Sequence, residues 1–213
     1  MKVNNYPVKT PAAGDRLFGS DSNGDQKQFD MSNFLGEGFT YQIGEYVADK
    51  GGVIFHRYLD GSNENYLVVA ITDQSTGQAW SNVASLIGSS AQSTWNGLSN
   101  SNAIIGQSGF TSGIVSTCLN YSINSVDDWY LPSFDELYLV FNNRFNINRT
   151  LSGNSSYGSI SGATQISYAT YWSSTELDAN GAWTVNFQYS TGASLSKTGG
   201  TGGYARAVRK FSI

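Results

Sequence analysis

A proline followed by a complete helix-capping signal stands past the middle of this 213-residue sequence and constrains the local fold. Pro132 disfavours helical geometry in the residue before it, so the preceding segment is expected to be extended. Ser133 is a preferred N-cap, and Glu136 follows three residues later, which completes a capping box. Apolar residues at helical spacing continue as far as Phe145. The sequence therefore predicts an extended segment, a turn and an amphipathic helix over residues 134–146.

Strand patterns flank this helix on both sides. Upstream runs predict an antiparallel meander, with the nearly all-apolar run 66–71 at its centre. Downstream, short aromatic and alternating runs predict the closing strands of the sheet. The expected strands are 41–47, 52–59, 66–71, 171–175, 182–189, 192–197 and 205–211, and the further expected helices are 99–105 and 111–119. Antiparallel sheets with two or three helices indicate an α+β domain.

Four motifs in a fixed order give the sequence a family resemblance. Residues 129–137 read W-Y-L-P-S-F-D-E-L, 171–176 read Y-W-S-S-T-E, 182–187 read A-W-T-V-N-F, and 205–211 read A-R-A-V-R-K-F. Their order and spacing resemble those of a bacterial and phage domain family with a C-type-lectin-like fold. The resemblance covers most of the chain and implies that scaffold, which serves many binding functions. The structural positions that it implies are Trp129, Leu131, Pro132, Ser133, Glu136, Trp172, Trp183, Arg206 and Arg209.

The first 36 residues differ from the rest and form a second region. From Gly14 to Phe29 they follow the pattern G-D-x-L-x-G-x-D-x-x-G-x-x-x-x-F, which resembles N-terminal segments of phage virion proteins. Asn23-Gly24 is a turn signal, so a β-hairpin is expected there. An isolated hairpin is marginal in water and needs a partner. We therefore divide the chain into an attachment and oligomerisation arm, residues 1–36, and a C-type-lectin-like domain, residues 37–213.

Composition argues against several kinds of partner. A formal net charge of −4 without a basic run argues against nucleic acid. No apolar run approaches the ~18 residues of a membrane span, so no membrane insertion is expected. The first residues lack the apolar stretch of a signal peptide. The one cysteine, Cys118, allows no intrachain disulfide and is expected to be buried as a small apolar residue.

The sequence offers few groups for catalysis or metal binding. His56 is the only histidine, which leaves no zinc ligand set and no second imidazole as a base. The acidic stretch 21–25 departs from a calcium loop, because the glycine and the twelfth-position glutamate are misplaced. No P-loop, dinucleotide fingerprint or G-x-S-x-G elbow is present. We therefore expect no enzyme activity, no metal centre and no cofactor; an ion at the 178–180 turn stays open.

Surface recognition is the function that remains, and the strands after residue 180 carry the candidate surface. Alternation along residues 183–189 predicts Trp183, Val185, Phe187 and Tyr189 in the core, with the polar residues between them on the other face. The open alternative is an ordinary solvated sheet face. The candidate ligand-contact residues are Asn180, Thr184, Asn186, Gln188, Ser194 and Ser196.

Two arginines stand on the expected closing strand. Arg206 and Arg209 are three residues apart, so their side chains are expected on opposite faces. We expect one of them to form a structural ion pair with Glu176 or Glu136. Ligand binding by an arginine is the alternative.

These expectations combine into a function. We expect a non-enzymatic phage virion structural protein, a head or tail fibre or decoration subunit, that displays a lectin-like domain for host or surface attachment. Its partners are other virion proteins through residues 1–36, further copies of itself, with a trimer favoured by analogy with fibres, and a cell-surface glycan or protein. The expected location is the virion, after synthesis in the host cytoplasm. The alternative is a bacterial surface or secreted carbohydrate-binding module, and the missing signal peptide counts against it.

Overall fold

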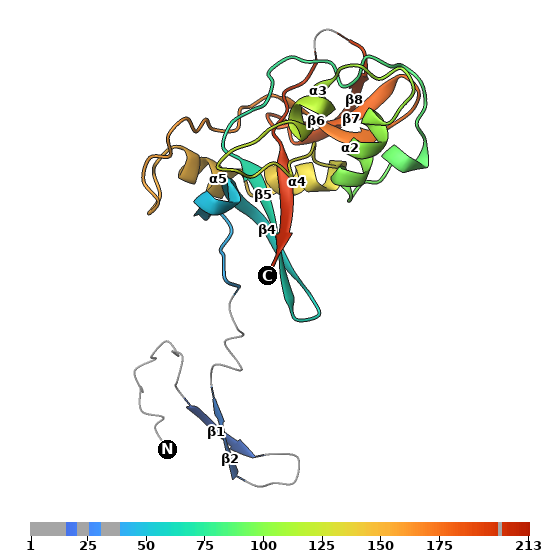
Figure 1. The fold of residues 1–213 in the computed structure, drawn as a ribbon. Coiled ribbons are helices and arrows are strands. Elements are labelled where there is room, and N and C mark those ends of the chain that lie inside the picture. Colours follow the sequence, from blue (N-terminus) through green and yellow to red (C-terminus); the bar gives the residue numbers. More distant parts are fainter. Residues whose placement is uncertain (1–15, 21–25, 31–38, 200–201) are drawn as a thin grey trace. The chain divides into compact units, whose positions relative to one another are not determined.

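Figure 1 shows the protein as a computed structural model. The described residues are 16–20, 26–30, 39–199 and 202–213. The chain separates into two compact units, Met1–Thr40 and Tyr41–Ile213. No helix among the described residues is long and apolar enough to cross a bilayer.

The first unit contains the predicted hairpin. Strands β1 (Arg16–Ser20) and β2 (Gln26–Asp30) pair antiparallel, with Arg16 opposite Asp30. The pairing confirms the hairpin expectation for this stretch. The Asn23-Gly24 turn and the acidic stretch 21–25 lie outside the described residues.

The second unit begins and ends on one four-stranded antiparallel sheet. Its order is β3 (Tyr46–Val47), β4 (Gly52–Asp60), β5 (Asn63–Ala70) and β9 (Val208–Ser212). Strand β5 lies between β4 and β9, as its apolar sequence predicted. The domain therefore starts and finishes on the two edge strands of one sheet, and the segment between β5 and β9 supplies the helices α2–α5 and a second sheet.

A three-stranded antiparallel sheet forms the other half of the domain (Figure 1). It consists of β6 (Thr170–Glu176), β7 (Gly181–Asn186) and β8 (Thr191–Ser196). Strand β7 is shorter than the expected 182–189. It ends at Asn186 because the side-chain oxygen of that residue accepts the backbone N–H groups of Gln188 (2.9 Å) and Tyr189 (3.0 Å), which turns the chain.

Within the described part of the chain there are four α-helices, whereas the sequence predicted two or three. The predicted helix 134–146 is in fact two helices that meet at Asn143, whose side-chain amide donates to the Leu139 carbonyl oxygen (3.1 Å). Phe145, expected on the apolar face, is 76% exposed. The helices are α2 (Gly97–Ile105), α3 (Ile114–Leu119), α4 (Phe134–Asn142) and α5 (Arg144–Leu151), with single 3₁₀ turns η1 (Ala48–Lys50) and η2 (Ser89–Ala91).

The predicted start of α4 is confirmed in detail. Ser133 Oγ accepts the Glu136 N–H (3.4 Å), and Glu136 Oε2 accepts the Ser133 N–H (2.7 Å), so the capping box is complete. The extended segment before Pro132 docks on β9, where Tyr130 and Val208 exchange two backbone hydrogen bonds (2.9 and 3.0 Å). The helix start is thereby tied to the end of the chain.

The main core fills the space between the four-stranded sheet, helices α4 and α5, and the inner face of the three-stranded sheet. Helix α4 packs on β4, β6 and β7, and α5 packs on β4. Cys118 is fully buried, as predicted. The core residues are Val53, Phe55, Leu67, Val69, Ile71, Tyr130, Leu137, Val140, Ile147, Leu151, Ile166, Tyr171, Val185, Phe187 and Val208.

Candidate functional site

The polar surface predicted on β7 and β8 is not a single face. Thr184 is fully buried, and its hydroxyl donates to the Ala193 carbonyl oxygen (3.1 Å). The strand register pairs Trp183 with Ser194, and directly paired residues share a face. Ser194 and, two residues on, Ser196 therefore lie on the tryptophan side of the sheet, opposite Thr184. The expectation of one continuous polar face was wrong.

The expected pattern fails at β7 because both faces of this strand are covered. Trp172 is paired with Thr184 and shares its face, where the indole is fully buried and donates to the Gln78 carbonyl oxygen (3.1 Å). The segment around Gln78 thus covers the face of the strand that was expected to be exposed to solvent. Tyr189, expected in the core, is 68% exposed beyond the end of β7, and Trp183 is half-buried against the Phe134 ring.

The remaining predicted contact residues have separate surroundings. Asn186 is half-buried, and its amide donates to the Thr170 hydroxyl (3.1 Å), so it shapes the turn after β7. The exposed members are Asn180, Gln188, Ser194 and Ser196. Their role as ligand contacts stays a prediction.

The turn at 178–180, where an ion was left open, is closed by its own hydrogen bonds. Asp178 Oδ1 accepts the N–H groups of Asn180 and Gly181 (2.8 Å each), and these bonds lower the pKa of the Asp178 carboxyl. Across the residues that the structure describes, no group of three or more His, Cys, Asp or Glu side chains is gathered as metal ligands.

A groove of about 390 Å³ lies between the four-stranded sheet and two of the helices. Strands β4, β5 and β9 form one wall, and the N-terminal ends of α2 and α4 form the other. Its volume lies within the range of about 300–1,000 Å³ that is usual for small-molecule sites. The lining residues are His56, Tyr58, Leu67, Trp95, Asn96, Leu98, Tyr130, Asp135, Glu136, Leu139 and Lys210.

The floor of the groove is a buried carboxylate on which two helices converge. Glu136 Oε2 accepts the Ser133 N–H (2.7 Å) and the Gly97 N–H (3.1 Å), while Oε1 accepts the Tyr130 hydroxyl (2.9 Å). Burial raises the pKa of Glu136, although these donors act in the opposite direction. A Cβ on Gly97 would lie 2.5 Å from Glu136 Oε2 and 2.7 Å from the Leu131 carbonyl oxygen, so only glycine fits. The capping box was predicted, but the link to α2 was not.

The walls of the groove carry one exposed aromatic ring and two half-buried ones. Trp95 is 73% exposed, although the indole is the largest apolar side chain. On the opposite wall, Lys210 Nζ lies 5.2 Å from the Tyr58 ring centroid, and the His56 ring lies 5.9 Å from it. Burial lowers the pKa of His56, so its imidazole is neutral at pH 7. Sequence reasoning missed this site; a tryptophan in the polar run before Asn96 was the available signal.

A second, wider hollow of about 800 Å³ lies between α5 and residues 165–168. Phe145 and Tyr168 are 76% and 71% exposed at its edge. Arg144 stacks between the rings of Phe141 (4.7 Å) and Tyr168 (5.0 Å) and donates to the Phe187 carbonyl oxygen (2.6 Å). Its guanidinium is therefore already engaged by the protein.

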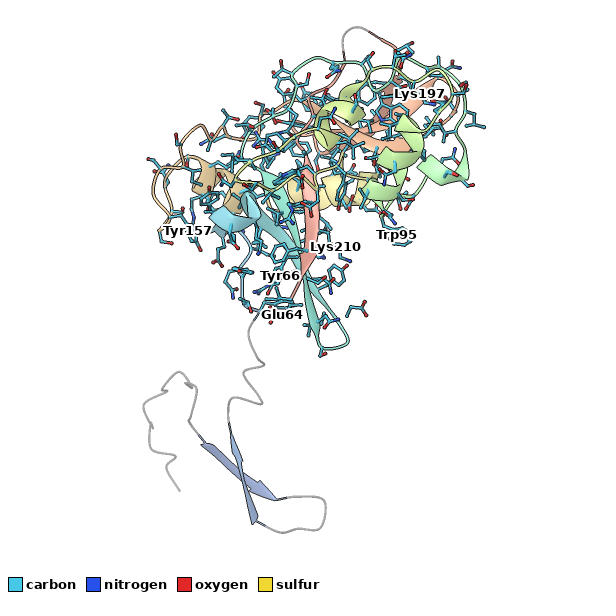
Figure 2. The ribbon with its side chains drawn as sticks, viewed as in Figure 1. Glu64, Tyr66, Trp95, Tyr157, Lys197 and Lys210 are labelled. Atoms are coloured by element: carbon cyan, nitrogen blue, oxygen red, sulfur yellow. The ribbon has the colours of Figure 1, made fainter. Side chains whose placement is uncertain are left out.

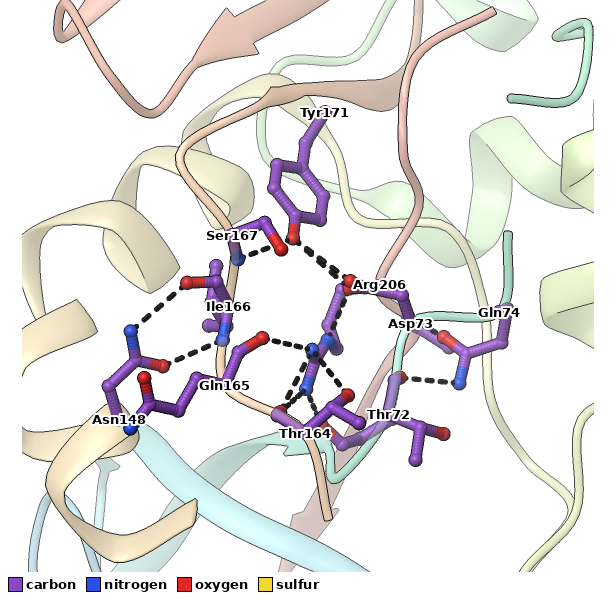
Figure 3. A network of polar contacts seen from close by, with 12 residues as sticks. Thr72, Asp73, Gln74, Asn148, Thr164, Gln165, Ile166, Ser167, Tyr171 and Arg206 are labelled. Carbon is purple, nitrogen blue, oxygen red and sulfur yellow. Dashed lines mark hydrogen bonds and ion pairs between the residues drawn. The ribbon is translucent and has the colours of Figure 1, made fainter. Parts of the chain in front are cut away.

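Figure 3 shows the polar network that holds the loop lining this hollow. Arg206 is 1% exposed; it forms an ion pair with Asp73 (2.7 Å) and donates to the carbonyl oxygens of Ala70, Thr164 and Gln165 (3.1–3.2 Å). One of the two arginines, Arg206 or Arg209, was expected to pair with Glu176 or Glu136, and that partner was wrong, because Arg206 pairs with Asp73 and Arg209 with Asp128. The structural role holds, because the Arg206 guanidinium joins the end of β5 to the loop.

The other expected ion-pair partners are also placed differently. Arg209 pairs with Asp128, whose side chain is 53% exposed. Glu176 pairs with Lys197 in a fully buried site and accepts the N–H groups of Ile87 (2.8 Å) and Gly88 (2.7 Å). Neither closing-strand arginine pairs with Glu176, because Lys197, the residue after β8, already forms the ion pair with it. Trp129, Leu131 and Trp172 are buried, as the resemblance implied.

The fold is an α+β domain, and it carries a groove of small-molecule size. The Lcl C-terminal domain family matches residues 69–209, and the chain belongs to this family. No curated protein sequence matches significantly. Among solved structures, a fimbrial protein from Bacteroides ovatus ATCC 8483 is similar, with a TM-score of 0.46 and 21% identity. The match covers 67% of this chain and 35% of that protein, so the chain spans little more than a third of its length.

Proposed function

We propose that the protein is a non-enzymatic recognition protein, a phage virion fibre or decoration subunit that displays a C-type-lectin-like domain for surface attachment. The groove supports this proposal most directly. Trp95 stands in water beside a floor that is held rigid by the hydrogen bonds of Glu136. An exposed aromatic ring next to a pre-organised floor is typical of a binding site.

The chain path supports the lectin-like assignment. Strands β3 and β9 belong to the same sheet, and the long segment between β5 and β9 supplies the loops and the second sheet. A sheet that contains both the first and the last strand of the domain, with a long loop-rich segment inserted between them, agrees with the fold that the motifs at 129–137 and 171–176 implied.

The state of the buried titratable groups favours recognition over catalysis. Glu136 and Glu176 are each held by two backbone N–H groups, which suits a structural carboxylate. Burial raises the pKa of the Cys118 thiol and of the Tyr130 hydroxyl, so both stay protonated. Groups in this condition are poor nucleophiles and bases.

The hairpin β1–β2 supports attachment through the N-terminal arm. Its two five-residue strands pair only with each other among the described residues. Two-stranded hairpins are marginal in water, so we propose that residues 1–36 are stabilised by virion partners or by a homo-oligomer, with a trimer favoured. The proposed location is the virion.

A bacterial surface or secreted carbohydrate-binding module is the second candidate. The exposed Trp95 ring favours it, because sugar rings present apolar C–H faces that stack on aromatic side chains. This candidate uses the same groove and differs in where the protein is anchored.

Deletion of residues 1–35 tests the proposal. We expect the shortened chain to keep the far-ultraviolet circular dichroism of the folded domain, to lose the oligomer in light scattering, and to be left out of particles assembled with the full set of virion proteins. A shortened chain that assembles as well as the full chain would refute attachment through the arm.

A further inference from the structure

The indole of Trp95 is held in water by an ordered backbone. Ser93 Oγ accepts the N–H groups of Trp95 (3.4 Å) and Asn96 (3.1 Å), and the Thr94 carbonyl oxygen accepts the Asp135 N–H (2.7 Å). The segment is thus fixed to both α2 and α4. Figure 2 shows Trp95 clear of the ribbon, on the side of the domain from which Lys210 projects. Because this ring lies at a groove of small-molecule size, it is a candidate contact for a ligand.

The charges along the groove select the kind of ligand. Asp135 is exposed on one wall and Lys210 on the other, so the rim carries one negative and one positive group. The ammonium group of Lys210 already lies over the Tyr58 ring. This face of the ring is therefore occupied and cannot bind a cationic ligand by a cation–π contact. An anionic ligand would face Asp135. A neutral ligand meets neither repulsion.

The apolar and polar groups of the groove match the two faces of a sugar ring. Leu67 and Leu139 give the groove an apolar base, and Trp95 offers a flat ring for stacking. Asp135 and Lys210 supply an acceptor and a donor for hydroxyl groups. The floor needs no rearrangement, because the oxygens of Glu136 are already hydrogen-bonded.

We propose that this groove binds a neutral pyranose ring, stacked on Trp95 and hydrogen-bonded to Asp135 and Lys210. The proposal names the ligand class of the recognition function above and rests on it. It places the ligand on the groove rather than on β7 and β8. A single hexose is expected to bind with a dissociation constant on the order of 1 mM, as is usual for about a dozen heavy atoms.

A titration of the full chain with neutral methyl glycosides tests the proposal. The sugars are glucose, galactose, mannose and N-acetylglucosamine, and binding is measured by calorimetry and by iodide quenching of tryptophan fluorescence. Trp80, Trp129 and Trp172 are fully or almost fully buried and Trp183 is half-buried, so the quenching that is lost in Trp95→Ala identifies the contribution of Trp95. We expect at least one glycoside to protect the ring and Trp95→Ala to weaken its binding at least tenfold. The matched control is Phe145→Ala, an equally exposed ring on the second hollow, which should bind as the wild type does.

Three results would overturn the groove assignment: no binding of any neutral glycoside by the full chain, tighter binding of glucosamine or sialic acid than of the neutral sugars, or loss of binding in Gln188→Ala with Trp95→Ala unaffected. Each of these leaves the outcome of the arm deletion unchanged, because particle incorporation does not depend on the sugar. Failure of the groove is thereby distinguished from failure of the proposed function.

Discussion

Replacing Arg206 and Arg209 in turn by methionine compares an ion pair that is buried on both sides with one whose carboxylate is half-exposed. Arg206 is 1% exposed, and its partner Asp73 has a side chain that is 10% exposed. Arg209 pairs with Asp128, which is 53% exposed. Methionine keeps much of the length and apolar contact of the arginine and removes its charge and donors. The two substitutions are therefore matched in chemistry and differ in burial.

The expected costs differ severalfold. Arg206→Met removes the cation beside the Asp73 carboxylate and the guanidinium donor of three carbonyl oxygens, and breaking a buried pair in this way costs about 3–5 kcal/mol. A domain of this size loses about 2–4 °C in Tm per kcal/mol, so the expected drop is roughly 6–20 °C. Arg209 is itself 10% exposed, but Arg209→Met leaves behind a carboxylate, Asp128, that is 53% exposed and stays in contact with water, so a cost of about 1 kcal/mol or less is expected.

Urea unfolding followed by tryptophan fluorescence gives both free energies of unfolding, and native-state hydrogen exchange adds a local readout. The Thr164 and Gln165 carbonyls accept from Arg206, so the amides of this loop should exchange faster in Arg206→Met and unchanged in Arg209→Met. Equal losses of stability for the two variants would refute the reasoning, as would a destabilised Arg206→Met with a loop as protected as in the wild type.

Three further predictions concern other buried positions. Gly97→Ala should destabilise the domain by about 1–3 kcal/mol, because a Cβ there lies 2.5 Å from Glu136 Oε2, whereas Gly77→Ala, with nothing within 4 Å, should be neutral in urea unfolding. Burial raises the pKa of Glu136 in the folded state, so the folded state binds that proton more tightly than the unfolded state does. The wild type should therefore lose stability relative to Glu136→Gln as the pH rises above about 4.5 and through the folded-state pKa. A stability difference between the two proteins that stays flat from about pH 4 to about pH 8 would contradict this. Native Cys118 should resist Ellman's reagent and react fully in denaturant; rapid native labelling would contradict its burial.

Local signals in the sequence predicted the elements that depend on local contacts. The capping box at Ser133 and Glu136 lies within one helical turn, so propensity and geometry agree there. The end of the same helix was predicted four residues too late. Periodicity counted Phe145 as apolar surface for the core, but the Asn143 side chain bonds back to Leu139 and starts a new helix direction.

The polar face on β7 failed for a non-local reason. A period of two identifies which residues share a face, and it cannot tell whether a distant segment covers that face. Residues near Gln78, about a hundred positions away in sequence from β7, bury Thr184 and Trp172. The groove was missed for the same reason, since Trp95, Tyr58 and Lys210 meet only through the tertiary fold.

The buried carboxylates and the residues of the groove walls have different roles in the domain. Three buried carboxylates, Asp73, Glu136 and Glu176, each bind groups from segments far apart in the chain, which holds long loops in place in a chain whose single cysteine allows no disulfide of its own. Two of them belong to the motifs. The groove wall at His56, Tyr58 and Lys210 lies outside the family match at 69–209, whereas Trp95, Asp135 and the three carboxylates lie inside it.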